Sequence, residues 1–225
     1  MKYFLTYNDN THTGYLLDLL KSVERYGKDF KIIVVNKTDI DPDFVLKNSA
    51  ILDLKRGGGY WLWKPFIINE LLKTIEDGDT IFYLDSAYYF IEDFMELYSQ
   101  IEIEDILVWK NKPNEYGNYV KNWCKMDVII KYDVFHSVFN ENLEDCWAGA
   151  IVVKKNKNTI KYIQDWLDMC CIYEDITDAP SHIKNNPMFI DHRHDQSLLS
   201  IVLHKNKLKL HFFPKKYLQN VRIPF

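Results

Sequence analysis

The chain has 225 residues, a hydrophobic fraction of 47%, an aromatic fraction of 15% and a formal net charge of −4. This composition excludes a disordered chain, and the slightly negative charge argues against a general nucleic-acid-binding protein. The length is that of one domain with a full hydrophobic core, so we expect a single domain over residues 1–225.

The cysteines and the apolar runs indicate where such a protein resides. The four cysteines follow no disulfide or metal-binding spacing, which is typical of a reducing compartment. The first apolar run is too short for a signal peptide, and no stretch is long enough to span a bilayer. We therefore expect a soluble, cytoplasmic protein, which for a viral protein means the host cytoplasm.

The predicted elements alternate between strands and helices along the chain. Short apolar runs between turn residues predict strands, and apolar residues spaced by three and four predict helices. We expect strands at Lys2–Tyr7, Phe30–Asn36, Ala50–Leu54, Thr80–Leu84, Asp105–Lys110, Trp147–Val153 and Leu208–Phe213. We expect one helix that ends at Gly27 and a short one that begins at Asp41-Pro42. Further helices are expected at Tyr60–Glu76, Glu92–Ser99, Lys121–Tyr132, Thr159–Tyr173 and Asp195–Lys205, and a long loop at Glu174–Pro187. This order predicts an α/β fold with a mostly parallel central sheet.

Asp85 directly follows the apolar strand predicted at Thr80–Leu84. The carboxyl ends of strands in open α/β sheets are where ligands bind, and a carboxylate there suits a hard divalent cation. The functional interpretation is that Asp85 holds a metal that bridges the phosphates of a nucleotide. The alternative is that Asp85 only caps the following turn.

A run of three glycines, Gly57–Gly59, precedes an apolar segment and lies between Arg56 and Lys64. Bare backbone N–H groups and two flanking cations could neutralise a diphosphate, where charge develops in group transfer. The run lacks both the Walker and the GxGxxG spacing, so a tight turn that requires positive φ is the competing interpretation. Pro65 interrupts the helical pattern, so residues 60–64 could instead form an extended or one-turn piece.

The segment Asp191–Gln196, DHRHDQ, concentrates titratable groups at the start of a predicted helix. Asp195 could be only the helix cap. It could also contact a sugar hydroxyl or act as a base, with Gln196 beside it as a donor to the substrate. A third interpretation is a metal bound by His192, His194 and Asp195, although no HExxH-type spacing supports it.

Four segments together carry a resemblance to a known family: RGGGYWLWKP, GDTIFYLDSA, WAGAIVV and HRHDQSLLS. They resemble small glycosyltransferases of the GT-A fold, a group of compact viral and bacterial enzymes that includes a chlorovirus enzyme for capsid glycans. The resemblance implies a Rossmann-like α/β/α sandwich that binds a nucleoside-diphosphate sugar, usually a UDP-sugar, with Mn²⁺ or Mg²⁺. It also implies a glycan or glycoprotein acceptor.

The resemblance assigns a metal site to three positions. Asp85 matches the first acid of the DxD motif of the family, and His211 matches a carboxy-terminal histidine ligand of related enzymes. This sequence departs from the motif at Ala87, which stands where the second acid is expected. We therefore expect a metal shell of Asp85, His211 and the region of Ala87, with one carboxylate fewer than in the family.

The resemblance also assigns the nucleotide-sugar contacts. Asp195 and Gln196 match a pair that lies near the donor sugar, and Thr6 and Tyr7 match contacts to the uracil. An inverting enzyme needs a carboxylate base for the acceptor hydroxyl, for which Asp195 and Asp127 are the candidates. The missing second acid and the Asp-Gln pair favour a retaining enzyme by analogy.

The main hypothesis from the sequence is therefore a metal-dependent glycosyltransferase. Two alternatives stay open: a nucleotidyltransferase that acts on a sugar phosphate, and a non-catalytic module that binds nucleotide-sugars.

Overall fold

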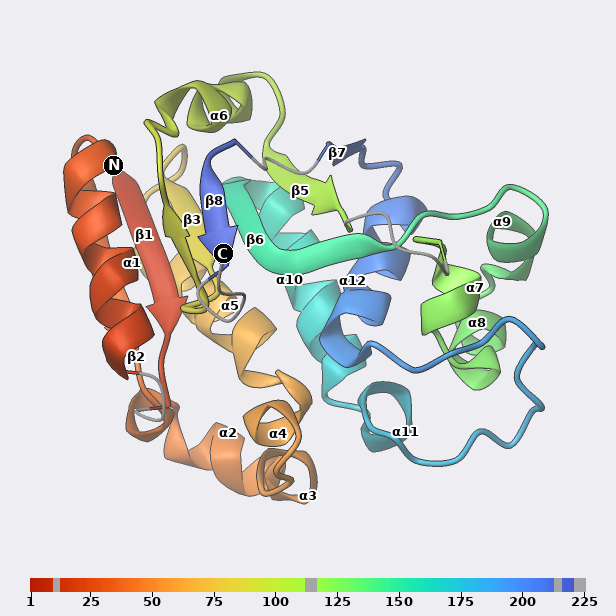
Figure 1. Ribbon diagram of the computed structural model, residues 1–225. Coiled ribbons are helices and arrows are strands. Elements are labelled where there is room, and N and C mark those ends of the chain that lie inside the picture. The colour runs from red at the N-terminus through yellow and green to blue at the C-terminus, as the bar shows by residue number, and fades with distance from the viewer. Residues whose placement is uncertain (10–12, 112–116, 213–215, 221–225) are drawn as a thin grey trace.

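The computed structural model describes residues 1–9, 13–111, 117–212 and 216–220 and has a central sheet between two layers of other elements (Figure 1). The sheet has the strand order β2-β1-β3-β6-β5-β7, and every strand runs parallel to its neighbours except β6, which is antiparallel to β3 and β5. The strands are β1 (Lys2–Tyr7), β2 (Phe30–Val35), β3 (Thr80–Leu84), β5 (Ile106–Lys110), β6 (Cys146–Lys154) and β7 (Leu210–His211). The prediction of an α/β fold with a mostly parallel sheet is confirmed.

The helices occupy the connections between these strands. They are α1 (Thr13–Tyr26), α2 (Pro42–Lys47), α3 (Ser49–Leu52), α4 (Gly57–Tyr60), α5 (Trp63–Thr74), α6 (Met95–Ser99), α7 (Val120–Trp123), α8 (Met126–Lys131), α9 (Phe135–Phe139), α10 (Lys157–Cys170), α11 (Tyr173–Ile176) and α12 (His194–Lys205), with 3₁₀ turns η1 (Lys37–Asp39) and η2 (Gln100–Glu102). A two-stranded antiparallel ribbon, β4 (Tyr88–Phe90) with β8 (Leu218–Asn220), stands apart from the main sheet.

Alternation along the buried strands separates the core into two layers. Side chains at successive positions of a strand point to opposite faces of the sheet. In β3, Ile81 and Tyr83 therefore pack with α5, α10 and α12, whereas Phe82 and Leu84 pack with α1, α6 and the ribbon. Both faces of the sheet are covered, which gives the α/β/α sandwich expected from the resemblance.

The structure differs from the prediction at several places in the chain; for example, residues 174–176 belong to helix α11, where a loop was predicted. Residues 49–52 form helix α3 rather than a strand, since a short apolar run fits either element. The helix predicted from Tyr60 begins at Trp63. The helix predicted at Lys121–Tyr132 is two short helices, because Cys124 and Lys125 are extended between them.

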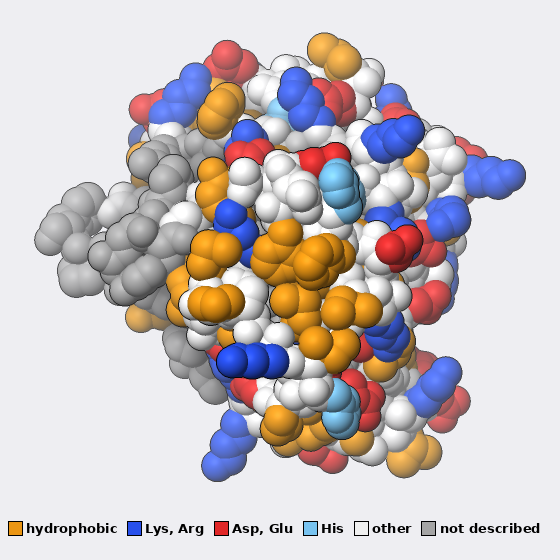
Figure 2. Space-filling view, turned by 90° about the vertical axis from the view of Figure 1, so that its right-hand side faces the viewer, with side chains coloured by type: hydrophobic (Ala, Val, Ile, Leu, Met, Phe, Trp, Pro, Cys, Tyr) orange, Lys and Arg blue, Asp and Glu red, His pale blue; other side chains and the backbone are white. Residues whose placement is uncertain are grey.

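The segments α7–α9 and the loop before α12 lie at one side of the sheet, on the right of Figure 1. Figure 2 looks onto that side, where apolar side chains gather among charged ones. The exposed large apolar residues of these segments include Ile130, Phe135, Met188 and Ile190. Within the described part of the chain, none of the helices has the length and apolar character needed to cross a bilayer.

Candidate active site

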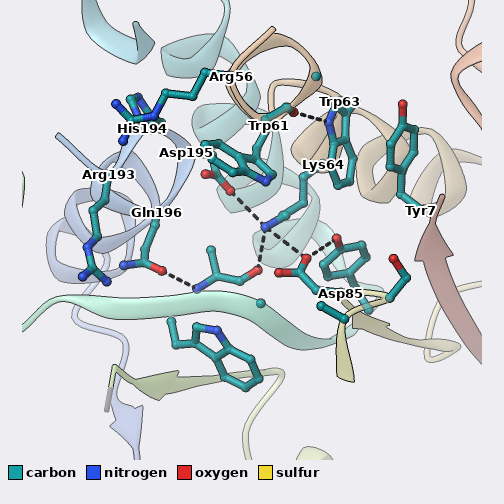
Figure 3. Close-up of a pocket in the computed structure, with 18 of the residues that line it drawn as sticks. Tyr7, Arg56, Trp61, Trp63, Lys64, Asp85, Arg193, His194, Asp195 and Gln196 are labelled. Carbon is teal, nitrogen blue, oxygen red and sulfur yellow. Dashed lines mark hydrogen bonds and ion pairs between the residues drawn. The ribbon is translucent and has the colours of Figure 1, made fainter. Parts of the chain in front are cut away.

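A cavity of about 640 Å³ lies where β1 and β3 end and β6 begins (Figure 3). Its other walls are the Gly57–Gly59 turn, the amino-terminal part of α5 and the start of α12. Aromatic side chains form much of the described lining: Tyr7, Trp61, Trp63, Tyr83, Tyr88, Trp123 and Trp147. Aromatic faces of this kind pack well against sugar rings and nucleobases.

Lys64 lies at the centre of the cavity floor, with its side chain almost fully buried. Its Nζ is 3.3 Å from Asp85 Oδ1, 3.3 Å from Asp195 Oδ2 and 3.1 Å from the Ala148 carbonyl oxygen (Figure 3). We call Lys64, Asp85, Asp195 and Ala148 the floor of the cavity. The floor joins helix α5, the end of β3, the start of β6 and the first turn of α12, so the sheet topology itself assembles it.

Burial and charge together set the proton affinities of the floor. Burial raises the pKa of Asp195 to about 6, against the opposing effect of Lys64. Burial alone would lower the pKa of Lys64, but Asp195 and Asp85 outweigh it, so the pKa is raised and the ammonium stays charged. Burial also raises the pKa of Tyr83 well above its ordinary value, so the hydroxyl stays protonated. It donates a hydrogen bond to Asp85 Oδ1 at 2.6 Å.

The glycine run forms a left-handed turn. Gly57, Gly58, Gly59, Tyr60 and Trp61 all have positive φ, between 54° and 94°. An L-side chain at Gly57 would collide with the Trp61 ring, and one at Gly59 would lie 2.6 Å from Leu52 Cα. The interpretation of the run as a turn that requires positive φ is confirmed, and the strained residues Tyr60 and Trp61 lie beside the cavity, where such strain commonly has a functional role.

Arg56 precedes this turn and lies at the mouth of the cavity. Its guanidinium donates to Asp178 Oδ2 at 2.9 Å and to Asp191 Oδ2 at 2.6 Å, and Tyr60 also donates to Asp178 at 2.9 Å. We call Arg56, Tyr60, Asp178 and Asp191 the rim of the cavity. The structure therefore places both predicted diphosphate cations at the cavity, Lys64 in the floor and Arg56 in the rim.

Gln196 faces the cavity from the first turn of α12, next to Asp195. Its amide nitrogen donates to Asp145 Oδ2 at 2.7 Å, and its amide oxygen accepts from the Ala148 N–H at 3.3 Å. Asp145 is fully buried, and burial raises its pKa to about 6 despite hydrogen bonds from Asn111, Ser200 and Gln196. These contacts fix the orientation of the Gln196 amide and leave it one further N–H.

The two predicted uracil contacts have different environments. Tyr7 lines the cavity, and its ring stacks on Trp63 with 3.8 Å between centroids and 16° between planes. Thr6 is fully buried, and its hydroxyl donates to the Leu84 carbonyl at 2.8 Å within the sheet. Only Tyr7 of this pair is available at the cavity surface.

Two predicted site residues lie away from the cavity. Asp127 accepts the backbone N–H groups of His182 and Ile183 at 2.7 and 2.8 Å, which ties α8 to the loop before α12. His211 lies on the edge strand β7, and its Nε2 is 2.9 Å from Glu104 Oε2. The structure brings neither residue to Asp85, because each has a local partner outside the residues that line the cavity.

The residues assigned to a metal do not fit a divalent ion in this arrangement. Asp85 already contacts Lys64 and Tyr83, Ala87 offers no carboxylate, and His211 pairs with Glu104. Among the described residues, no group of three or more His, Cys, Asp or Glu side chains is arranged to hold a metal. A hard divalent cation needs about six oxygen ligands, several of them from the protein or the substrate.

Two parts of the site had little signal in the sequence. Asp145, which orients Gln196, directly precedes a strand and has no motif around it. The Ala148 carbonyl contributes through its backbone, and only the small residues of WAGA indicate that backbone could approach a ligand or a side chain there.

No sequence family and no curated protein sequence matches this chain. Solved structures do match it in fold. Mouse xyloside xylosyltransferase 1 superposes with a TM-score of 0.51 and 8% identity over 94% of this chain and 84% of its own. The bifunctional glycosyltransferase WbbM superposes with a TM-score of 0.53 and 13% identity over 95% of this chain and 38% of its own.

A glycosyltransferase involved in the glycosylation of the major capsid of PBCV-1 is also similar, with a TM-score of 0.39 and 14% identity over 80% of this chain and 68% of its own. At that score the similarity adds nothing to the first two comparisons. The central sheet, its two covering layers and these two superpositions agree with one another. The chain has the fold of the GT-A glycosyltransferases.

Proposed function

We propose that the chain is a glycosyltransferase. It moves a sugar from a nucleoside-diphosphate sugar, for which UDP is the expected nucleotide, to a hydroxyl of a glycan or glycoprotein acceptor. The observation that carries the proposal is the floor, where Lys64 lies between Asp85 and Asp195 in a cavity at the carboxyl ends of the strands. That is the edge at which open α/β sheets bind nucleotides.

The remaining lining supplies the contacts that such a donor requires. The Tyr7–Trp63 stack offers an aromatic surface for a base, and Asp195 and Gln196 present a carboxylate and an amide for sugar hydroxyls. Arg56 lines the cavity, where its guanidinium could reach a diphosphate. The expected Mn²⁺ is not included in the proposal, because the described residues do not fit it.

The proposed reaction retains the anomeric configuration. The bond from the anomeric carbon to the phosphate oxygen breaks, the bond to the acceptor oxygen forms on the same face, and the acceptor proton passes to the departing diphosphate. Retention is favoured because each carboxylate considered as a base is engaged. Asp195 pairs with Lys64, and Asp127 binds backbone N–H groups outside the cavity.

The experiment is donor turnover by the whole chain with a panel of nucleotide-sugars. We expect release of a nucleoside diphosphate from a UDP-sugar, and NMR of the product should show the anomeric configuration of the donor. Asp195→Asn should reduce the rate by at least about 100-fold, since it removes charge next to the reacting sugar. Asp127→Asn is the matched control, because it removes the same charge outside the cavity and should retain activity.

Three outcomes would contradict the proposal. Release of pyrophosphate from a nucleoside triphosphate would identify a nucleotidyltransferase instead. Binding of UDP-sugars without any turnover would indicate a binding module. An unaltered rate in the Asp195→Asn protein would show that the charge of Asp195 in the floor does not contribute to the reaction.

A further inference from the structure

Lys64 occupies a complete oxygen cage. Its ammonium group has three N–H donors, and three oxygens surround it at 3.1–3.3 Å: the Ala148 carbonyl, Asp85 Oδ1 and Asp195 Oδ2. The side chain is 4% exposed, so water does not compete for these contacts. The Ala148 carbonyl accepts a hydrogen bond from the ammonium, and the two carboxylates pair with it as ions.

A divalent ion at this floor would need the same oxygens. An ion shared by Asp85 and Asp195 would have to take the place of Lys64 Nζ, which is within 3.3 Å of both carboxylates. The other partner of Asp85 Oδ1 is the Tyr83 hydroxyl at 2.6 Å, a donor that also competes with a metal for that oxygen. The chain therefore supplies the positive charge of the floor through a covalently attached group.

The charges around the cavity balance without an added ion. Among the described residues that line it, the number of Lys and Arg side chains equals the number of Asp side chains. The cations are Lys55, Arg56, Lys64 and Arg193, and the carboxylates are Asp9, Asp85, Asp191 and Asp195.

We propose that Lys64 is the built-in cation of this site and that the chain binds its nucleotide without a divalent metal. This inference rests on the proposed function for its ligand, and it departs from the metal dependence that the sequence resemblance implies. It predicts that transfer continues in the presence of a chelator. It also predicts that removal of the ammonium opens a metal site that the unaltered chain lacks.

The first test measures binding rather than activity. Titration of the whole chain with Mn²⁺, followed by electron paramagnetic resonance, should show no saturable binding below about 1 mM, the weak end of the range for oxygen-ligand sites. Calorimetric titration with UDP should give the same affinity in EDTA and in Mn²⁺ to within about twofold, or less than 0.5 kcal/mol. Stoichiometric binding of Mn²⁺ at micromolar concentration, or UDP binding that requires Mn²⁺, would overturn the inference.

The second test uses a pair of variants. Lys64→Ala leaves Asp85, Asp195 and the Ala148 carbonyl around an open space, and this protein should gain saturable Mn²⁺ binding. Lys55→Ala removes an exposed lysine from the same cavity and should gain none. Equal Mn²⁺ binding by the two variants would contradict the cage, and if Lys64→Ala does not fold, the titration of the unaltered chain still decides the question.

These tests separate the inference from the function on which it rests. If a UDP-sugar is turned over only when Mn²⁺ is added, the proposed function stands and the built-in cation is wrong. If no nucleotide-sugar is turned over under any condition, the proposed function fails, whereas the Mn²⁺ titrations of the unaltered chain and of Lys64→Ala still report on the cage.

Discussion

The floor and the rim of the cavity each hold one cation between two aspartates, but they differ in their access to water. In the floor, the side chains of Lys64, Asp195 and Asp85 are 4%, 5% and 29% exposed. In the rim, those of Arg56, Asp178 and Asp191 are 42%, 39% and 45% exposed. The same pairing of charges is therefore a buried cage in one region and a solvated contact in the other.

The comparison shows what burial does to an ion pair. Charges taken out of water need compensation, and in the floor Lys64 pairs with both Asp85 and Asp195. Exposed charges are screened and replaceable, so the rim can exchange a carboxylate for a phosphate at little cost. The floor is suited to hold a geometry, and the rim is suited to admit a ligand.

The largest loss of stability is expected when the buried cation, Lys64, is removed. Lys64→Met should lower the free energy of unfolding by about 3–5 kcal/mol, because it leaves Asp85 and Asp195 without their partner in the interior. Urea denaturation at neutral pH measures this change. A loss below about 1 kcal/mol, the ordinary effect of an exposed pair, would show that the floor is as solvated as the rim.

The pH dependence of stability tests a carboxyl group next to the floor. Burial raises the pKa of Asp145 from 3.8 to about 6, so the folded state favours the protonated form. The contribution of this group to stability is full below about pH 4, declines as the pH rises to about 6 and is lost above that. The total decline is up to about 3 kcal/mol, at about 1.4 kcal/mol per pKa unit. Urea denaturation of the unaltered chain and of Asp145→Asn should show a stability difference that changes over this interval, and a constant difference would contradict the prediction.

The glycine turn beside the rim is expected to be less tolerant of substitution than the ion pairs of the rim. Gly59→Ala should cost more than about 2 kcal/mol, because its φ of 94° disfavours an L-residue and its Cβ would collide with Leu52. Gly78→Ala is the matched control, since its φ is 88° but nothing lies within 4 Å of the added Cβ. Equal losses of unfolding free energy in the two variants would mean that backbone conformation alone, without the contact to Leu52, sets the cost.

The smallest effect is expected from the exposed cation. Arg56→Met should change the free energy of unfolding by less than about 1 kcal/mol, and the difference should shrink further as salt is added. Urea denaturation at low and high ionic strength checks both statements. A loss as large as that of Lys64→Met, insensitive to salt, would remove the distinction between rim and floor.

The sheet and the floor were predictable because both depend on patterns that lie within single segments. Apolar runs predicted β1, β2, β3, β5 and β6. A strand-end acid, a cation after glycines and an acid at a helix start predicted the three charged members of the floor. The pairing among those members was not predictable. It depends on contacts between residues as far apart as Lys64 and Asp195, and no local pattern records them.

The failures have the same physical origin. His211 is a plausible metal ligand and Asp127 a plausible base by residue type, but tertiary contacts give them other partners, Glu104 and the backbone of residues 182–183. The start of α5 was placed too early because Tyr60 and Trp61 adopt positive φ, which neither aromatic residue favours by itself. The contacts of Trp61 with Gly57 and His194 hold that conformation, and they exist only in the folded chain.

The antiparallel strand β6 also determines when the floor can exist during synthesis on the ribosome. Strands β1, β2 and β3 come from the first 84 residues and can pair as soon as they emerge. Lys64 and Asp85 emerge with them, but the Ala148 carbonyl arrives only with β6 and Asp195 only with α12. Between the synthesis of Asp85 and that of Ala148 the lysine therefore lacks two of its three oxygen partners, and the nascent chain can complete the surroundings of that charge only after Asp195 has been made.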